Sequence, residues 1–156
     1  MFKRILMAID DSGPAARAVE VAVKIARQVG GELAAVHVVD SSLALTPEMT
    51  IVNERTMAQL RQRGVEILNA ACAQVPVGMP IERFHVAGEP ADCILATAQE
   101  WGADLIVIGS DSRGRLAHFL LGSTADSVIR KASCPVMTVR ASAAVGAELY
   151  GEHHAT

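Results

Sequence analysis

The stretch LIVIGSDSRGRLAHFLLGSTADSVIRK, residues 105–131, joins a strand pattern to a helix pattern through a polar loop. Residues 105–108 are continuously apolar, as is typical of a parallel strand whose two faces are both covered. Residues 123–131 repeat apolar side chains at helical spacing, with Val128 and Ile129 expected to point inward. A strand followed by a helix that packs back onto the sheet is the unit of an α/β fold.

The same unit recurs along the rest of the chain. Further strands are expected at residues 4–9, 33–39, 81–86 and 135–139, and further helices at 14–29, from the late fifties to 73, and at 91–101. Residues 41–54 have no clear periodicity, so we expect a loop or an irregular helix there. The repeated order of strand and helix predicts an open parallel sheet with right-handed crossovers.

Several residues carry specific expectations about how these elements begin, end and pack. Ser12 is a good N-cap for the first helix, and Gly30-Gly31 supplies the residue that can take a positive φ after its last turn. Gly64, inside the second helix, indicates a close contact between that helix and the sheet. His37 alternates with apolar neighbours on the second strand, so we expect an interior histidine whose hydrogen bonds are satisfied.

Length and composition favour one domain with an aliphatic core. The chain has 156 residues, of which 51% are hydrophobic and only 3% aromatic, so Ala, Val, Ile and Leu must fill the interior. One domain is expected over residues 1–140. The remaining residues, 141–156, lack a core pattern, and we expect a flexible tail.

Charge and hydropathy exclude several classes of partner. The 14 Lys and Arg residues against 17 Asp and Glu residues give a net charge of −3, which argues against nucleic acid as a partner. No apolar stretch approaches the roughly 20 residues of a membrane span. The N-terminal sequence MFKRILMAID enters the first strand without a cleavage site, so a cytoplasmic location is expected. Cys72, Cys93 and Cys134 are scattered, and we expect them to be buried apolar residues.

Ligands of open parallel sheets bind beyond the carboxyl ends of the strands. The loop after Ile108 is the richest of the loops at that edge, because it contains Gly109, Gly114 and Gly122 before the start of a helix. Small residues let the backbone approach a ligand, and the unpaired N–H groups of a helix start attract anions. A phosphate group is the natural occupant, although an ordinary solvated loop has the same composition.

This loop resembles the loop of the universal stress protein family in its ATP-binding branch, whose pattern is Gly-x(2)-Gly-x(9)-Gly-Ser/Thr. Gly109, Gly122 and Ser123 stand at the first, third and fourth positions with the family's spacing, and Ser112 stands where the second glycine is expected. The resemblance covers residues 2–140. It includes ILMAIDDS (5–12), AVHVVD (35–40), VAGEPADCI (86–94) and LLGSTADSVIRKASCPVMTV (120–139).

The resemblance implies a fold and an assembly. The family's fold is a five-stranded parallel sheet with helices on both faces, a three-layer α/β/α arrangement that is Rossmann-like and adenine nucleotide alpha hydrolase-like. The family usually forms dimers in which the last strand, residues 135–139 here, pairs antiparallel with its copy across a two-fold axis. Such pairing would cover an apolar edge strand.

The resemblance also implies an ATP site, with or without Mg²⁺. Ile9 and Asp10 would lie against the base and ribose, and the backbone of Val38 would face the adenine edge. The phosphates would take hydrogen bonds from the glycine loop and the helix start, that is from Gly109, Gly122, Ser123 and Thr124. Ser112 puts a Cβ where the family has glycine, which restricts the backbone at that position. Gly114, two residues later, restores part of the conformational freedom of the loop backbone.

Three functional hypotheses follow from these residues. The first is a cytoplasmic, dimeric ATP-binding regulatory protein of the stress response, with hydrolysis slow at most. The second is a Mg²⁺-dependent ATP hydrolase that uses Asp10, because adjacent carboxylates such as Asp10 and Asp11 can hold Mg²⁺. A phosphate-receiving regulatory domain also begins with two such carboxylates, but it needs a Lys after the fifth strand, where this chain has Arg140 and Ala141. Asp11 is better explained as a negative charge that favours the positive end of the first helix. The third is a family member that has lost nucleotide and serves as a dimeric interaction module.

Overall fold

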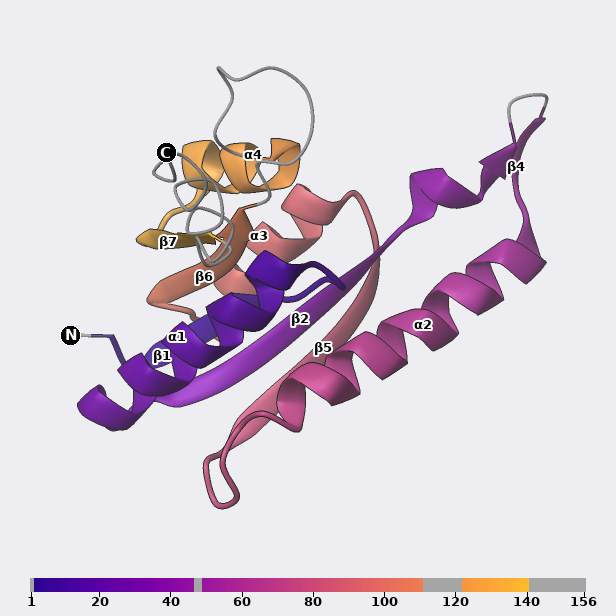
Figure 1. The fold of residues 1–156 in the computed structure, drawn as a ribbon. Coiled ribbons are helices and arrows are strands. Elements are labelled where there is room, and N and C mark those ends of the chain that lie inside the picture. Colours follow the sequence, from indigo (N-terminus) through magenta and orange to yellow (C-terminus); the bar gives the residue numbers. More distant parts are fainter. Residues whose placement is uncertain (1, 47–48, 111–121, 141–156) are drawn as a thin grey trace, which may run out of the picture.

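The computed structural model describes residues 2–46, 49–110 and 122–140 (Figure 1). Five parallel strands form one sheet in the order β5-β2-β1-β6-β7. The strands are β1 (Arg4–Ala8), β2 (Glu32–Asp40), β5 (Ile81–Gly88), β6 (Leu105–Ser110) and β7 (Val136–Arg140). The predicted open parallel sheet is therefore confirmed, whereas the expected flexible tail at 141–156 lies outside the described residues.

Four α-helices cover the two faces of this sheet (Figure 1). They are α1 (Gly13–Val29), α2 (Glu54–Cys72), α3 (Pro90–Trp101) and α4 (Ser123–Lys131). Residues of α1 and α2 share one hydrophobic cluster with the sheet, and residues of α3 and α4 share a second cluster on the other face. The strands alternate between these clusters, because Ile5 and Met7 of β1 face the first and Leu6 faces the second. This is the expected three-layer α/β/α arrangement.

Side-chain caps set the boundaries of α1 and α3. Ser12 Oγ accepts from Ala15 N–H at 3.2 Å, and Gly30 ends α1 with a φ of 61°. At α3 the Glu89 carboxylate accepts from two N–H groups of the first turn, and Gly102 ends the helix with a φ of 74°. The predicted ends of these two helices are confirmed, and each helix begins one residue before its predicted start.

The segment between β2 and α2 differs from the prediction. Ser41–Ala44 form a short 3₁₀ helix, and Leu45–Thr46 (β3) pair antiparallel with Met49–Val52 (β4). α2 then begins earlier than predicted, because the Asn53 side chain caps it by accepting from Thr56 N–H. The short 3₁₀ helix agrees with the expected irregular helix, whereas the expectation was wrong for the two strands. Strands of two and four residues are too short to show an alternating pattern.

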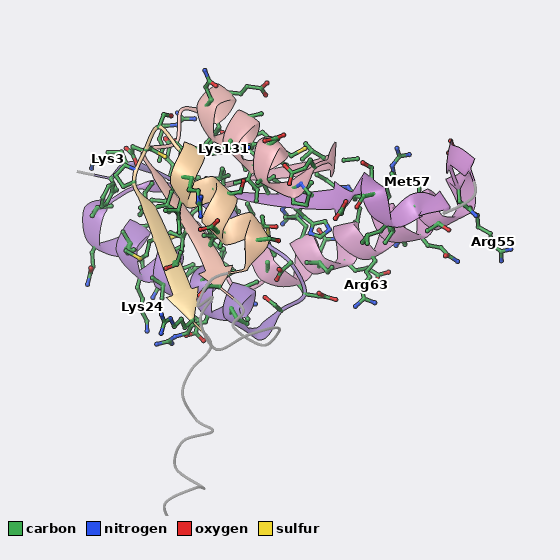
Figure 2. All side chains as sticks on the ribbon, turned by 90° about the horizontal axis from the view of Figure 1, so that it is seen from above. Lys3, Lys24, Arg55, Met57, Arg63 and Lys131 are labelled. Carbon is green, nitrogen blue, oxygen red and sulfur yellow. The ribbon has the colours of Figure 1, made fainter. Side chains whose placement is uncertain are left out.

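A small hydrophobic cluster joins α2 to the end of β2. Met57 of α2 is buried against Val39 of β2 and Ala44 of the 3₁₀ helix. Figure 2 shows Met57 and Arg55 toward the end of α2 that lies beside the β3–β4 pair. This cluster holds the start of α2 at the carboxyl end of β2, and the helix then runs back over the face of the sheet, where Leu68 and Ala71 join the first hydrophobic cluster.

The inward face of α4 contains only one of the two residues that were predicted there. Val128 is completely buried, as predicted, whereas Ile129 is 40% exposed. The buried residues of this nine-residue helix are Ala125 and Val128, three positions apart. A single inward row fits a short helix that contacts α3 and the outer strands, so Ile129 falls on the solvent side.

Gly64 and His37 meet where α2 crosses β2 and β5. A Cβ atom at Gly64 would lie 2.4 Å from His85 Nε2 and 2.6 Å from His37 Cδ2. The predicted close contact between helix and sheet is confirmed. His37 is 9% exposed and its Nδ1 lies 2.8 Å from the Ile9 carbonyl oxygen, which confirms an interior histidine with a satisfied hydrogen bond.

The only tryptophan of the chain lies at the opposite end of the sheet. Trp101 Nε1 donates to Glu82 Oε1 at 2.9 Å, and the Arg4 guanidinium lies 4.4 Å from the centre of the indole ring. Arg4 begins β1 and Trp101 ends α3, so this cluster ties the amino ends of two strands to the end of the helix.

Candidate functional site

A cavity of about 280 Å³ opens at the carboxyl ends of β1, β2 and β6, bounded by the starts of α3 and α4. β1 is the strand at which the chain order reverses, because β2 pairs with one of its edges and β6 with the other. Ligands of open parallel sheets bind at such a switch point. Its lining residues are Ala8, Ile9, Asp10, Val36, Val38, Pro90, Ile94, Ile108, Gly109, Gly122, Ser123, Thr124 and Ala125.

Seven of the nine predicted site residues line this cavity. They are Ile9, Asp10, Val38, Gly109, Gly122, Ser123 and Thr124. The other two, Ser112 and Gly114, lie outside the described residues. Four separate segments of the chain thus come together, as expected for parallel strands that all end at one edge.

One wall of the cavity was missed by the sequence prediction. Pro90 and Ile94 belong to the first turns of α3 and offer apolar surface. Ile94 is 4% exposed, so the same side chain also packs into the core. The spacing of these two residues could have revealed this wall. Pro90 and Ile94 are four positions apart at the start of a helix, so they share one helix face, and that face can contact both the sheet and a ligand at its edge.

The end of β2 presents backbone groups to the cavity. Ile9 N–H donates to Val36 C=O at 2.9 Å, so the backbone groups of Val36 point toward β1. In a strand, the backbone N–H and C=O groups of every second residue point to the same side. The groups of Val38 therefore point to the same side as those of Val36. At the level of Val38, however, β1 has already ended, since its last residue is Ala8. Among the described residues, neither group of Val38 forms a hydrogen bond with this continuation of β1.

Asp10 sits at the rim of the cavity in a fixed orientation. Its Oδ1 accepts from Ser12 N–H at 2.9 Å, which closes a local turn after β1. No described residue donates to its Oδ2, and the residue is exposed. One carboxylate oxygen is therefore used by the fold while the other is available to a hydroxyl donor.

The start of α4 lies at the other end of the cavity. Gly122 occupies the N-cap position with φ −64° and ψ 158°, and no side chain within the described part of the chain caps this helix. α1, α2 and α3 are each capped by a side chain, from Ser12, Asn53 and Glu89. Among the described residues, the first N–H groups of α4 have no hydrogen-bond partner, and they lie at the positive end of a helix, which is an arrangement that binds anions.

Gly109 lets β6 approach α1. A Cβ atom at this position would lie 2.7 Å from both the backbone nitrogen of Ala15 and the carbonyl carbon of Pro14. Real Cβ contacts essentially never become so short. The glycine is therefore required by packing in addition to its place in the cavity lining.

Asp11 does not have the expected role at the start of α1. It precedes the N-cap Ser12, and the first turn of α1 contains no acidic residue. The Asp11 carboxylate instead forms an ion pair with Arg63 of α2, and the hydrogen bond from Arg63 holds the pKa of Asp11 below its usual range. The two adjacent carboxylates are thus directed to different partners, which does not fit a shared Mg²⁺ site.

The remaining reactive side chains are inert in this fold. Burial raises the pKa of the Cys72, Cys93 and Cys134 thiols, so all three stay neutral. Cys72 is buried as predicted, and the other two are half-buried. Within residues 2–46, 49–110 and 122–140, no cluster of three His, Cys, Asp or Glu side chains has the geometry to hold a metal ion. In the same ranges, no helix is long and apolar enough to cross a bilayer.

Fold and cavity together define an α/β protein with a ligand site at the switch point of a parallel sheet, and sequence comparison gives its family. The model of the universal stress protein family matches residues 1–140. Universal stress protein YxiE of Bacillus subtilis (strain 168) is 35% identical over an alignment of 148 residues, and the alignment covers 90% of this chain and 100% of that protein. The chain belongs to the universal stress protein family, as the motif resemblance predicted.

Solved structures of the family share the fold. A universal stress protein from Archaeoglobus fulgidus superposes with a TM-score of 0.73 at 28% identity, covering 89% of this chain and 99% of that chain. A universal stress protein in complex with cAMP superposes with a TM-score of 0.58 at 26% identity, covering 90% and 98% of the two chains. The Rossmann-like class predicted from the sequence is confirmed.

Proposed function

We propose that this chain is a cytoplasmic ATP-binding regulatory protein of the stress response. The observation that carries the proposal is the cavity at the switch point: within the part of the chain that the structure describes, Val38 leaves backbone groups unbonded at one end of it, and the start of α4 has no side-chain cap at the other. A relative of the same fold was solved in complex with cAMP, so an adenine nucleotide suits this family's site. The chain resembles the ATP-binding branch through Gly109, Gly122 and Ser123.

The nucleotide is proposed to lie across the ends of β1, β2 and β6. The adenine edge faces the N–H and C=O of Val38, and Ile9 and Ile94 offer apolar contact to the base. Asp10 Oδ2 accepts from a ribose hydroxyl. The phosphates meet the first N–H groups of α4, where the Ser123 and Thr124 hydroxyls are also at hand.

Regulation by binding is favoured over hydrolysis. A Mg²⁺-dependent hydrolase needs carboxylates that converge on the metal, and Asp11 is committed to Arg63. Asp10 alone remains at the cavity rim among the acidic residues described. Hydrolysis is therefore proposed to be slow at most, and the bound nucleotide is proposed to control the affinity of the protein for its partners.

Calorimetric titration with ATP, in the presence and absence of Mg²⁺, tests the proposal. Heat of binding at micromolar to millimolar ATP is expected, and Asp10→Ala is expected to weaken binding about tenfold, the effect of one charge-assisted hydrogen bond. Asp11→Ala is the matched control, because its carboxylate does not line the cavity. Absence of heat at millimolar ATP would refute the proposal and favour a dimeric interaction module without nucleotide.

We also propose a homodimer formed through β7. β7 is the edge strand of the described sheet, and Val136, Met137 and Thr138 remain half-exposed. Ile106 N–H donates to Pro135 C=O, so alternate residues of β7 from Pro135 onward face β6, and the backbone groups of Thr138 face outward. A second copy of β7 can pair with this open edge.

Proline at position 138 tests this dimer. Thr138→Pro removes an outward N–H without touching the ladder to β6, so the fold is expected to survive while the dimer dissociates. Sedimentation equilibrium should then give 16.4 kDa in place of twice that mass. Thr138→Ala keeps the N–H and should remain dimeric, and a dimeric Thr138→Pro protein would place the interface elsewhere.

A further inference from the structure

We propose that His37 is a positioning residue of the nucleotide cavity, an inference that rests on the function proposed above. By holding the Ile9 carbonyl, His37 ends the pairing of β1 with β2 one rung early. The backbone of Val38 is thereby kept available to a ligand. His37 itself does not line the cavity, so it acts through Ile9 and Val38.

The ladder between β1 and β2 shows the missing rung. In a regular parallel ladder, Ile9 N–H donates to Val36 C=O and the next bond runs from Val38 N–H to Ile9 C=O. The first of these bonds is present at 2.9 Å, and among the described residues the second is not. The Ile9 carbonyl instead lies 2.8 Å from His37 Nδ1. Because a carbonyl oxygen can only accept, Nδ1 carries a proton and donates it to this contact.

His37 stands out among its neighbours on the same face of β2. Leu33 and Ala35, at the preceding positions on this face, are buried members of the hydrophobic core. A buried polar side chain in such a row requires a partner, and the Ile9 carbonyl is that partner. The imidazole is therefore directed to the end of β1 by its hydrogen bond.

The ring of His37 is fixed from two further sides. It stacks on His85 of β5 with 5.7 Å between the ring centres and 23° between the planes. Gly64 of α2 lies against both rings, where any larger side chain would collide with them. Burial lowers the pKa of His85, so its ring is neutral at pH 7 and does not repel its neighbour. These contacts hold the His37 imidazole from two sides while its Nδ1 contacts the Ile9 carbonyl.

Loss of the imidazole donor would change the backbone of the site. With phenylalanine at position 37 the ring remains for stacking on His85, but the Ile9 carbonyl loses its partner. The nearest alternative donor is Val38 N–H, whose bond would complete the next rung of the ladder. In that hydrogen bond, Val38 N–H would no longer be available to the adenine base. The bond would also bring the ends of β1 and β2 closer together.

Hydrogen exchange of the Val38 amide tests the backbone part of the inference. In the wild-type protein without nucleotide, this amide is expected to exchange fast for a strand residue. In His37→Phe it is expected to become protected at least tenfold, while His37→Asn, whose Nδ2 can donate in place of Nδ1, stays near wild type. His85→Phe is the matched control, because it retains a stacked ring and does not touch Ile9.

Nucleotide affinity tests the functional part. ATP is expected to bind about tenfold more weakly to His37→Phe, and the preference for ATP over UTP is expected to shrink, because a lost base contact changes selectivity as well as affinity. His37→Asn should restore both, and His85→Phe should retain both. Equal selectivity in His37→Phe and wild type would overturn the role in base recognition.

The two parts separate failure of this inference from failure of the proposed function. If the wild-type protein binds no nucleotide, the proposed function fails, and the exchange of Val38 still decides whether His37 ends the ladder. A slowly exchanging Val38 amide in the wild type would overturn the inference even if ATP binds. The same holds if His85→Phe protects Val38 as strongly as His37→Phe.

Discussion

Replacement of Gly109 by valine is expected to lower the free energy of unfolding by about 3 kcal/mol, at the upper end of the range for overpacked cores. The Cβ of the new side chain would meet backbone atoms of Pro14 and Ala15 at 2.7 Å, and a backbone contact cannot be relieved by a rotamer change. Relief requires α1 to move away from β6, which opens the hydrophobic cluster that both share. Urea unfolding with an unchanged m-value would measure the loss.

The control for this prediction is a glycine in the same region with free space around it. A Cβ at Gly13 would have no atom within 4 Å, so Gly13→Ala is expected to change the unfolding free energy by no more than about 0.5 kcal/mol. Gly109→Ala should fall between the two variants. A Gly109→Val protein as stable as the wild type would mean that the contact between α1 and β6 does not constrain the fold.

Gly122→Asp is expected to stabilise the protein and abolish most of its nucleotide binding. The N-cap position of α4 already has the extended backbone that a capping aspartate adopts, so the carboxylate should add about 0.5 kcal/mol to the unfolding free energy. The same carboxylate would occupy the N–H groups proposed for the phosphates and repel their charge. ATP affinity should fall about 100-fold, which corresponds to about 2.7 kcal/mol of lost attraction and added repulsion.

Opposite changes in stability and affinity separate this effect from simple damage to the fold. Gly122→Asn supplies a neutral cap, so it should give a similar gain in stability with a smaller loss of affinity. Thermal unfolding and calorimetry on the same samples would give both quantities. Retention of full ATP affinity in Gly122→Asp would show that the phosphates do not bind at the start of α4.

Local chemistry made most of the fold predictable from the sequence. Continuous apolar runs such as residues 105–108 indicated buried strands, and Ser12 and Gly30 marked the ends of α1 because capping depends on neighbouring residues alone. The segment 41–52 was not predictable in the same way. Its two short strands gain stability by pairing with each other, and that pairing leaves no periodic trace in the sequence.

The site was only partly predictable. Glycines and a helix start after β6 indicated an anion site, but the solvated-loop interpretation stayed open until the family motif was considered. The ion pair between Asp11 and Arg63 joins residues 52 positions apart, and no local pattern could reveal it. His37 was correctly expected to be satisfied, whereas its partner, the Ile9 carbonyl, depends on how β1 ends beside β2.

The position of Trp101 has a practical consequence for all of these experiments. The indole is held between Arg4 and Glu82 at the amino end of the sheet, away from the cavity at the carboxyl end. As the sole tryptophan, it gives the protein a single indole fluorophore whose emission should report unfolding and remain unchanged when ligand binds. Fluorescence and calorimetry would then read stability and affinity as independent signals from every variant.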